Sequence, residues 1–277
     1  MEEQVSAHYN SEDLKDKIFK ALENLGRDIT SLTPKELAPI DQLHTGGAWA
    51  TRAVLELAGI EPGSRILDAG CGIGGSSRLM ADESGHRVTG IDLSDEFIRA
   101  ARALTESTLL SDRVEFRQGS ILDMPFEDQS FDAVLCQHVL MNIEDKPAAL
   151  TEFHRVLRPG GKLILHEVVK GQSGPAAYPV PWASGPEISH LESSENTGQW
   201  IREAGFAPAS EIDGTPKALQ WWLKAKAAAK KNAAPGTFGP ALIFGENASR
   251  FGVNMSANLE TDCIRVIEAV FEKEPVK

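Results

Sequence analysis

Short apolar runs alternate with segments of helical periodicity between residues 64 and 169, and no other feature constrains the fold of this chain as much. The runs SRILDAG (64–70) and KLILHEVV (162–169) have the length of strands, and few residues separate the runs from the helical segments. Strands that alternate with helices in this way pair in parallel through right-handed crossovers. The pattern therefore predicts an open α/β sheet.

A glycine-rich loop, ILDAGCGIGG (66–75), follows the first apolar run and precedes a helical segment. Ligands bind at the carboxyl ends of the strands in such sheets, and glycines there let a ligand lie against bare backbone and the next helix N-terminus. Gly70, Gly72 and Gly75 fit the dinucleotide pattern G-x-G-x-x-G, whereas Gly70, Gly72 and Gly74 fit a different one. The glycines alone leave the class of ligand open.

Two acids narrow the choice of ligand. Asp92 ends the second strand, 24 residues after Asp68, where a carboxylate can accept hydrogen bonds from both ribose hydroxyls of an adenosine-containing ligand. Asp68 precedes the glycines, so the pyrophosphate of a dinucleotide would meet a negative charge a few ångströms away. S-adenosylmethionine has no phosphate and carries a cationic amino group and a sulfonium. The acidic loop therefore favours S-adenosylmethionine over NAD as the cofactor.

The stretch LDAGCGIGG resembles motif I of the class I S-adenosylmethionine-dependent methyltransferases. Further motifs of that family follow in order, namely GIDLS (90–94), GSILDMPFEDQSFDAV (119–134) and RVLRPGGKLIL (155–165). The resemblance implies an α/β, Rossmann-like fold with a seven-stranded, mostly parallel sheet. In that fold IRVIEAVFEK (264–273) would be the antiparallel last strand.

The rest of the chain is divided around this unit. We expect an N-terminal helical cap at residues 1–60 and a helical lid insertion at residues 215–256, where the helical pattern is irregular. The S-adenosylmethionine-binding domain would then comprise residues 61–214 and 257–277.

The segment LHTGGAWATRAVLELAGI (43–60) is similar to a Gly-Gly segment of the phosphoethanolamine and sarcosine/dimethylglycine methyltransferases, where it covers the methionine carboxylate. His44 in this segment would touch the cofactor or only order the loop. The adenine turn departs from the family, because Ser120 stands where an Asp is common and a hydroxyl is a weaker partner than a carboxylate. The residues expected to bind the cofactor are Thr45, Gly46, Asp68, Gly70, Cys71, Gly72, Asp92, Leu93, Ser120, Ile121 and Gln137.

Methyl transfer from a sulfonium needs alignment, exclusion of water and, for some acceptors, removal of a proton. His138 follows the fourth strand, and we expect it to act as the base or to hydrogen-bond the acceptor, unless it only caps or packs. Tyr9 is the second catalytic candidate, since the phosphoethanolamine relatives pair an N-terminal Tyr with a His, but that His falls at Asn142 here. One of His166 and Glu167 should face the crevice, unless the two form a buried structural pair.

Aromatic residues occur in the two segments that overhang the methyl-transfer site in this fold. We expect Tyr178, Trp182 and Trp221 to line the acceptor pocket, where aromatic walls suit a flat apolar acceptor or a methylated ammonium. The alternative is that one tryptophan of the pair Trp221 and Trp222 anchors the lid helix to the core.

The formal net charge of −12 disfavours nucleic acid as a partner, since an acidic surface repels phosphate backbones. No apolar run approaches the roughly 20 residues that span a bilayer, and the acidic N-terminal stretch does not fit a signal peptide. The three cysteines lie far apart without metal-ligand spacing. We therefore expect a cytoplasmic monomer or homodimer that uses no metal, nucleic acid or membrane.

The main prediction is an S-adenosylmethionine-dependent methyltransferase (EC 2.1.1 class) that acts on N, O or S of a small molecule. Two alternatives stay open, a C-methyltransferase of a quinone or polyketide ring and a non-catalytic S-adenosylmethionine-binding module. An NAD-dependent oxidoreductase is disfavoured by Asp68.

Overall fold

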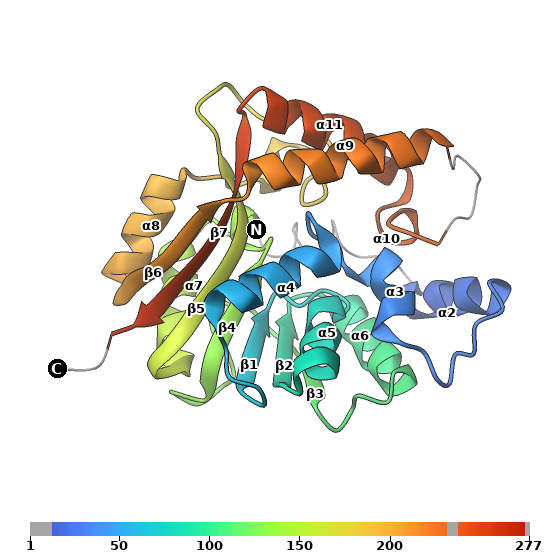
Figure 1. Ribbon diagram of the computed structural model, residues 1–277, viewed down its shortest axis with the longest axis horizontal. Helices are drawn as coiled ribbons and strands as arrows, with labels where there is room; N and C mark the ends of the chain where they lie inside the picture. The colour runs from blue at the N-terminus through green and yellow to red at the C-terminus, as the bar shows by residue number, and fades with distance from the viewer. Residues whose placement is uncertain (1–12, 232–237, 275–277) are drawn as a thin grey trace.

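The structure is a computed structural model that describes residues 13–231 and 238–274. Its described part contains a seven-stranded sheet in the order β3-β2-β1-β4-β5-β7-β6 (Figure 1). β7 pairs antiparallel with β5 and with β6, and the other neighbouring pairs are parallel. This confirms the predicted fold class. The strands are β1 (Arg65–Ala69), β2 (Arg87–Asp92), β3 (Val114–Gln118), β4 (Phe131–Gln137), β5 (Leu157–Lys170), β6 (Phe206–Asp213) and β7 (Ile264–Lys273).

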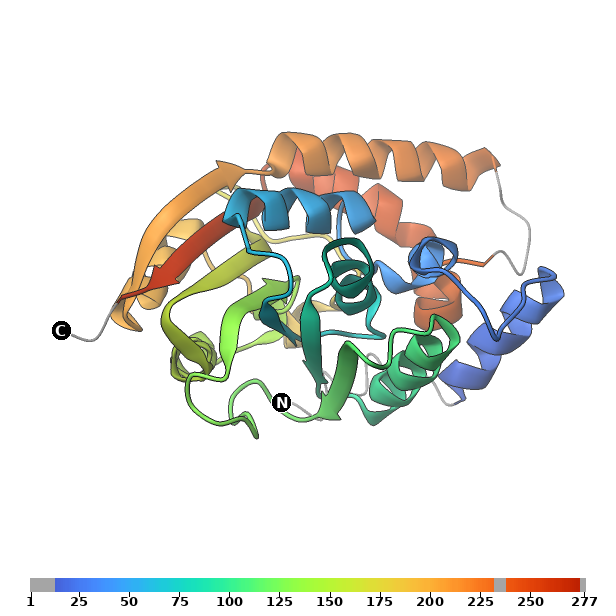
Figure 2. The same ribbon diagram turned by 60° about the horizontal axis from the view of Figure 1, so that its bottom comes forward.

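Helices cover both faces of the sheet because side chains alternate along each strand. Ile66 and Ile164 belong to the buried cluster that packs against α4, α5 and α6. Leu67 and Leu165, one residue further along the same strands, belong to the cluster with α7 and α8 on the other face. Figure 2 shows the sheet twisting between these layers from β6, in orange, to β3, in green. The covering helices are α4 (Gly47–Ala58), α5 (Gly75–Ser84), α6 (Asp95–Ser107), α7 (Lys146–Val156) and α8 (Ser194–Glu203).

Helix ends follow local sequence signals. Gly59 and Gly85 take left-handed φ angles of 56° and 65° and end α4 and α5, a conformation that glycine adopts without a steric penalty. Thr33 and Glu36 form a capping box at the start of α3 (Pro34–Asp41). Gly59 and Gly85 thus end α4 and α5 shortly before β1 and β2 begin.

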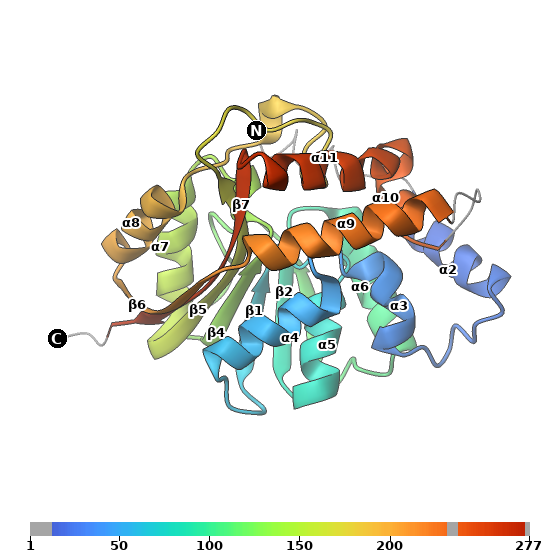
Figure 3. The same cartoon turned by 45° about the horizontal axis from the view of Figure 1, so that its top comes forward.

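Three helices, α9 (Thr215–Lys231), α10 (Ala241–Phe244) and α11 (Ala248–Glu260), lie in sequence between β6 and β7. Figure 3 shows α9 and α11 side by side above the carboxyl ends of the strands. α2 (Leu14–Asn24) buries Leu14, Ile18 and Leu22 in a cluster that also contains Ile243 of α10. The N-terminal helices and this insertion therefore meet at one end of the sheet. None of the helices in the two described ranges combines the length and apolarity needed to cross a membrane.

A buried ion pair lies beneath the glycine loop. The Arg78 guanidinium donates to the carboxylate of Asp41 at 2.9 Å, to the carbonyl of Ile73 at 2.7 Å and to the hydroxyl of Thr105 at 3.0 Å. Burial raises the pKa of Asp41, while the Arg78 charge acts in the opposite direction. Because these partners come from α3, the glycine loop and α6, one cation on α5 joins four parts of the chain.

We expect Arg78→Met to lower the free energy of unfolding by about 3–5 kcal/mol, because it leaves Asp41 as a buried charge without a partner. Urea denaturation at pH 7 measures the change. The matched control is Arg52→Met, since Arg52 pairs with Glu83 at 2.6 Å on the surface. That control should cost less than about 1 kcal/mol. Equal losses in the two variants would contradict the role given to Arg78.

Candidate active site

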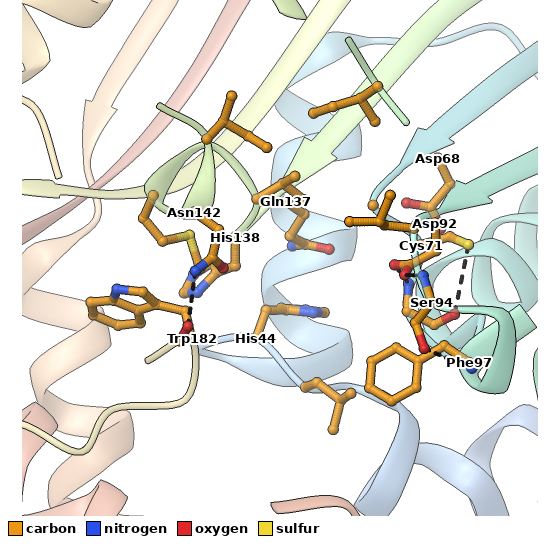
Figure 4. Close-up of a pocket in the computed structure, with 18 of the residues that line it drawn as sticks. His44, Asp68, Cys71, Asp92, Ser94, Phe97, Gln137, His138, Asn142 and Trp182 are labelled. Carbon is orange, nitrogen blue, oxygen red and sulfur yellow. Dashed lines mark hydrogen bonds between the residues drawn. The ribbon is translucent and has the colours of Figure 1, made fainter. Parts of the chain in front are cut away.

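A cavity of about 280 Å³ opens at the carboxyl ends of β1, β2 and β4. The strand order reverses between β1 and β4, which is where ligands bind in open α/β sheets. Figure 4 shows two groups of labelled side chains on opposite sides of the cavity, with Gln137 and His44 between them. We call one group the acidic end (Asp68, Cys71, Asp92, Ser94 and Phe97) and the other, together with His44, the histidine end (His44, His138, Asn142 and Trp182), because the rings of His44 and His138 lie 6.1 Å apart.

Most of the residues expected to bind the cofactor line this cavity. They are Asp68, Gly70, Cys71, Gly72, Asp92, Leu93, Ser120, Ile121 and Gln137. Thr45 and Gly46 were expected with them but are not part of the wall. The hydroxyl of Thr45 is buried and accepts a hydrogen bond at 3.1 Å from the indole N–H of Trp222, and Gly46 caps the start of α4. The Gly-Gly segment is thus tied to α9 rather than turned into the cavity.

Asp92 is held in one orientation at the end of β2. Its two carboxylate oxygens accept the backbone N–H groups of Gly72 and Ser94, each at 2.9 Å. A carboxylate has about four lone-pair positions, so each oxygen keeps room for a further donor. Burial raises the pKa of Asp92. The geometry suits a pair of hydroxyl groups such as those of a ribose.

Asp68 is buried beside the glycine loop and accepts a hydrogen bond from the Ser77 hydroxyl at 2.5 Å. Burial, together with the nearby Asp92 charge, raises the pKa of Asp68 to about 6. A cation bound here would lower that pKa again, because an opposite charge favours the ionised carboxylate, whereas a phosphate would raise it further. The acidic end is therefore built for an amino group and not for a pyrophosphate.

The glycines of the loop serve packing as well as ligand access. Gly70 and Gly72 line the cavity, but a Cβ on Gly70 would also lie 2.4 Å from a methyl carbon of Val139. Gly75 lies off the cavity, and a Cβ there would lie 2.2 Å from the carbonyl oxygen of Asp41. The interpretation that these glycines expose backbone to a ligand holds for Gly70 and Gly72, whereas Gly75 lets α3 approach α5.

Three histidines, His44, His138 and His166, group at the histidine end with ring centroids 4.8–6.1 Å apart. Burial lowers the pKa of His44 to about 4 and of His166 to about 3, and it lowers the pKa of His138 well below its ordinary value. All three rings are therefore neutral at pH 7. Nε2 of His138 is buried without a hydrogen-bond partner in the described part of the chain, and His138 lines the cavity. A neutral imidazole in this position can take up a proton or accept a hydrogen bond.

The backbone turns sharply where β4 meets the cavity. His138 has a φ of 55°, and its N–H donates to the carbonyl of His166 at 2.9 Å. The preceding side chain, Gln137, contacts Nδ1 of His166 at 3.0 Å and accepts from the hydroxyls of Thr51 and Ser76 at 3.1 and 2.9 Å. A non-glycine residue with positive φ is uncommon and is found often at functional sites. Polar contacts on β4 and β5 thus hold His138 at the cavity.

Glu167 and His166 form the buried structural pair that the sequence left as an alternative, because neither lines the cavity. The Glu167 carboxylate accepts the N–H groups of Val139 at 2.9 Å and Leu140 at 3.1 Å, directly after His138. Burial raises the pKa of Glu167 to about 7. Glu167 therefore anchors the loop that carries His138.

Of the aromatic residues expected at the acceptor pocket, one lines the cavity and two do not. Trp182 lines the cavity, where the Asn142 side-chain amide donates to its carbonyl at 2.9 Å. Tyr178 and Trp221 pack against the apolar cluster under α9 and α11 and lie off the cavity wall. Trp222 is the tryptophan that ties α9 to the core, with 8% of its surface exposed. Tyr9 lies outside the residues that the structure describes.

The sequence motifs did not select several other residues of the wall. Ser94 and Phe97 follow Asp92 closely, so nearness to a motif could have identified them. Phe244 comes from α10, far along the chain, and no pattern in the sequence points to it. Within residues 13–231 and 238–274, no three side chains of the types His, Cys, Asp and Glu are grouped so as to hold a metal ion.

Comparisons with known proteins bear on this site. Residues 67–165 match a family model described as a methyltransferase domain. The chain is 32% identical over 178 residues to phosphoethanolamine N-methyltransferase 1 of Arabidopsis thaliana, a match that covers 64% of this chain and 36% of that protein. It is 32% identical over 180 residues to 24-methylenesterol C-methyltransferase 2 of Oryza sativa subsp. japonica, covering 62% of this chain and 50% of the relative. The chain therefore spans between a third and a half of the length of these relatives.

A solved structure shares the fold. Phosphoethanolamine N-methyltransferase 2 of Haemonchus contortus, in complex with phosphomonomethylethanolamine and S-adenosylhomocysteine, superposes with a TM-score of 0.73 at 21% sequence identity. The superposition covers 94% of this chain and 58% of that one. At this level of identity the likeness concerns the fold.

We expect Glu167→Gln to change how stability depends on pH. The pKa of Glu167 rises from its ordinary 4.5 to about 7 in the folded protein, so the folded state keeps a proton that the unfolded state releases between these values. Stability is therefore highest below pH 4.5 and falls as pH rises through about 7. The neutral glutamine does not lose stability in this way. The difference in unfolding free energy between Glu167→Gln and the wild type should therefore shift in favour of the variant by about 3 kcal/mol from pH 4.5 to pH 8.

Urea midpoints at pH 4.5 and pH 8 test this expectation. Glu260→Gln, at an exposed position at the end of α11, is the control and should keep the pH dependence of the wild type. A Glu167→Gln profile parallel to that of the wild type would show that folding does not raise the pKa of Glu167.

Proposed function

We propose that this chain, whose residues 67–165 form a methyltransferase domain, is an S-adenosylmethionine-dependent methyltransferase that acts on N, O or S of a small molecule. The observation that carries the proposal is one cavity with two different ends. Its acidic end holds Asp68 and Asp92, and its other end is lined by His138, whose buried Nε2 has no hydrogen-bond partner among the described residues. The methyltransferase domain and the named relatives support the same activity.

The donor set fits the cofactor. Asp92 has free acceptor positions for two ribose hydroxyls, and Asp68 offers a carboxylate to an amino group. Ser120 and Ile121 line the same end, where the adenine would lie. When bound, S-adenosylmethionine supplies a methyl group on a positively charged sulfur, which is already activated for displacement.

The work left to the protein is alignment and proton removal. Burial keeps His138 neutral, so its free nitrogen can accept the proton of an O–H, N–H or S–H nucleophile. Apolar side chains such as Met141, Trp182 and Phe244 surround this end and keep water from competing with the acceptor. His138 is therefore our candidate for the catalytic base.

We propose that residues 215–256 act as a lid over the cavity, since Phe244 lines it and Trp222 ties α9 to Thr45. Residues 1–60 would form the N-terminal helical cap, with Tyr9 as a further catalytic candidate, and Thr45 and Gly46 would have to approach the cofactor by a movement of the Gly-Gly segment. A cytoplasmic location, the monomeric or homodimeric state and the absence of nucleic-acid and membrane partners stay predictions.

Incubation with labelled S-adenosylmethionine and a panel of amines, phenols and thiols, followed by product mass, tests the activity. Calorimetry should detect S-adenosylhomocysteine binding in the micromolar range. Tight binding of NAD without binding of S-adenosylhomocysteine would refute the proposal. Methyl transfer to carbon acceptors alone would favour the C-methyltransferase alternative, and cofactor binding without any turnover would favour a binding module.

We expect Asp92→Ala to weaken S-adenosylhomocysteine binding by about 10- to 100-fold, because hydrogen bonds to a charged group contribute about 1.5–3 kcal/mol. Calorimetric dissociation constants measure the effect. Asp112→Ala, at an exposed aspartate before β3, is the matched control and should leave the constant unchanged. An unchanged constant for Asp92→Ala would remove Asp92 from the cofactor site.

We expect His138→Ala to reduce kcat by about 10²- to 10⁴-fold, the usual contribution of a general base, without a comparable change in cofactor affinity. Steady-state kinetics and calorimetry on the same preparation separate the two quantities. If turnover and affinity both stay at wild-type values, His138 is not the base.

A further inference from the structure

We propose that the methyl acceptor is an uncharged, mainly apolar molecule that presents one O–H or N–H group to His138, and that acceptors with a phosphate or carboxylate group are excluded. This inference rests on the proposed methyltransferase function and names the substrate class of the same cavity. It is carried by the charges, the apolar surface and the hydrogen-bonding capacity of the cavity wall.

The wall offers no positive charge to an anionic acceptor. None of the described residues that line the cavity is a lysine or an arginine. Two buried cations lie behind the wall, and both are already engaged: the Lys146 ammonium donates to the carbonyls of Ile143 and His190, and Arg78 is paired with Asp41 beneath the glycine loop. The histidines at the histidine end are neutral at pH 7, because burial lowers the pKa of His44 to about 4 and holds the pKa of His138 well below its ordinary value. A phosphate or carboxylate would therefore lose its hydration without gaining a counter-charge.

The wall carries negative charge instead. Its acidic residues are Asp41, Asp68, Asp92, Glu144 and Asp145. The last two are exposed and lie at the start of α7, where Asp145 caps the helix by accepting the N–H of Ala148 at 3.0 Å. They form an acidic rim close to the histidine end. An anionic acceptor would meet like charges on entry and again inside the cavity.

The histidine end is apolar apart from a few side chains whose donors are already used. Its apolar wall comes from separate segments of the chain and consists of Met141, Ile143, Pro181, Trp182 and Phe244. The indole N–H of Trp182 donates to the hydroxyl of Ser189 at 2.9 Å, and the amide of Asn142 donates to two backbone carbonyls at 2.8–2.9 Å. A polar acceptor would lose hydrogen bonds to water here without replacement.

His138 leaves one hydrogen-bond acceptor unsatisfied at this end. Among the described residues of the cavity wall, two buried side-chain atoms have no hydrogen-bond partner, Nε2 of His138 and one oxygen of Asp41. Asp41 is paired with Arg78, so Nε2 of His138 is the atom that a donor group of the acceptor would satisfy. One donor group on an otherwise apolar molecule matches this surface. The donor would also be the nucleophile, since its proton passes to the atom that it contacts.

Three probes with the same ring test the inference: 2-naphthol, its methyl ether 2-methoxynaphthalene, and 2-naphthyl phosphate. Calorimetric affinities are measured with and without saturating S-adenosylhomocysteine. We expect 2-naphthol to bind at least tenfold more tightly than the phosphate ester. His138→Ala should weaken 2-naphthol binding about 3- to 10-fold, the range for one neutral hydrogen bond, and leave the methyl ether unaffected.

A charge substitution at the rim supplies the second test. Glu144→Lys should strengthen binding of 2-naphthyl phosphate about two- to fivefold and change 2-naphthol binding little. Glu195→Lys, with the same change of charge at an exposed position on α8, is the matched control. A phosphate ester that binds the wild type as tightly as 2-naphthol overturns the proposal, as does 2-naphthol binding that is undetectable or indifferent to His138→Ala. Equal effects of Glu144→Lys and Glu195→Lys on the affinity for 2-naphthyl phosphate would overturn the role of the rim.

The two proposals fail in different ways. Absence of S-adenosylhomocysteine binding would refute the methyltransferase function. The ratio of the affinities for 2-naphthol and 2-naphthyl phosphate, measured without S-adenosylhomocysteine, would still decide the class of molecule that the cavity accepts. Efficient methylation of phosphoethanolamine would refute the acceptor class and leave the methyltransferase function intact.

Discussion

The buried ion pair between Arg78 and Asp41 is the interaction on which the site depends. A guanidinium cannot lose its proton in a protein, so a buried arginine must be surrounded by acceptors. Arg78 finds them on α3, the glycine loop and α6. The loop that bears Gly70 and Gly72 is therefore fixed by a side chain that never touches the cavity, and α3 is brought close enough for Gly75 to be a requirement of packing.

Burial gives the two ends of the cavity opposite character. It raises the pKa of Asp68 to about 6 at one end, so this carboxyl gains from a cationic partner. It keeps the histidines neutral at the other end, where His138 retains an open nitrogen. The same desolvation thus prepares one end for a charged group and the other for an uncharged one. A cofactor with an amino group and an acceptor without an anionic group fit that division.

The sequence predicted the acidic end of the site well, because its residues cluster in short motifs at strand ends. Asp68, Asp92, Ser120 and Gln137 all lie on the cavity wall, as the alternation of strands and helices implies. Residues joined by distant packing were harder to place. Thr45 hydrogen-bonds Trp222, which is 177 positions away, and no local pattern encodes that contact. Trp221 and Tyr178 likewise pack against the apolar cluster of α9 and α11, because the face of an aromatic-rich segment that turns inward depends on its neighbours.

The sequence by itself determined the parallel sheet, the position of the cavity at its carboxyl edge and the two acids, Asp68 and Asp92, that line it there. These follow from periodicity and spacing, which are local properties of the chain. Only the tertiary structure decided which polar groups are already satisfied. Asn142 and Glu167 bond backbone groups, Trp182 bonds Ser189, and His138 keeps a free nitrogen. Burial and hydrogen-bond partners come from segments far apart in the chain, and they set both the charge of each group and its freedom to meet a substrate.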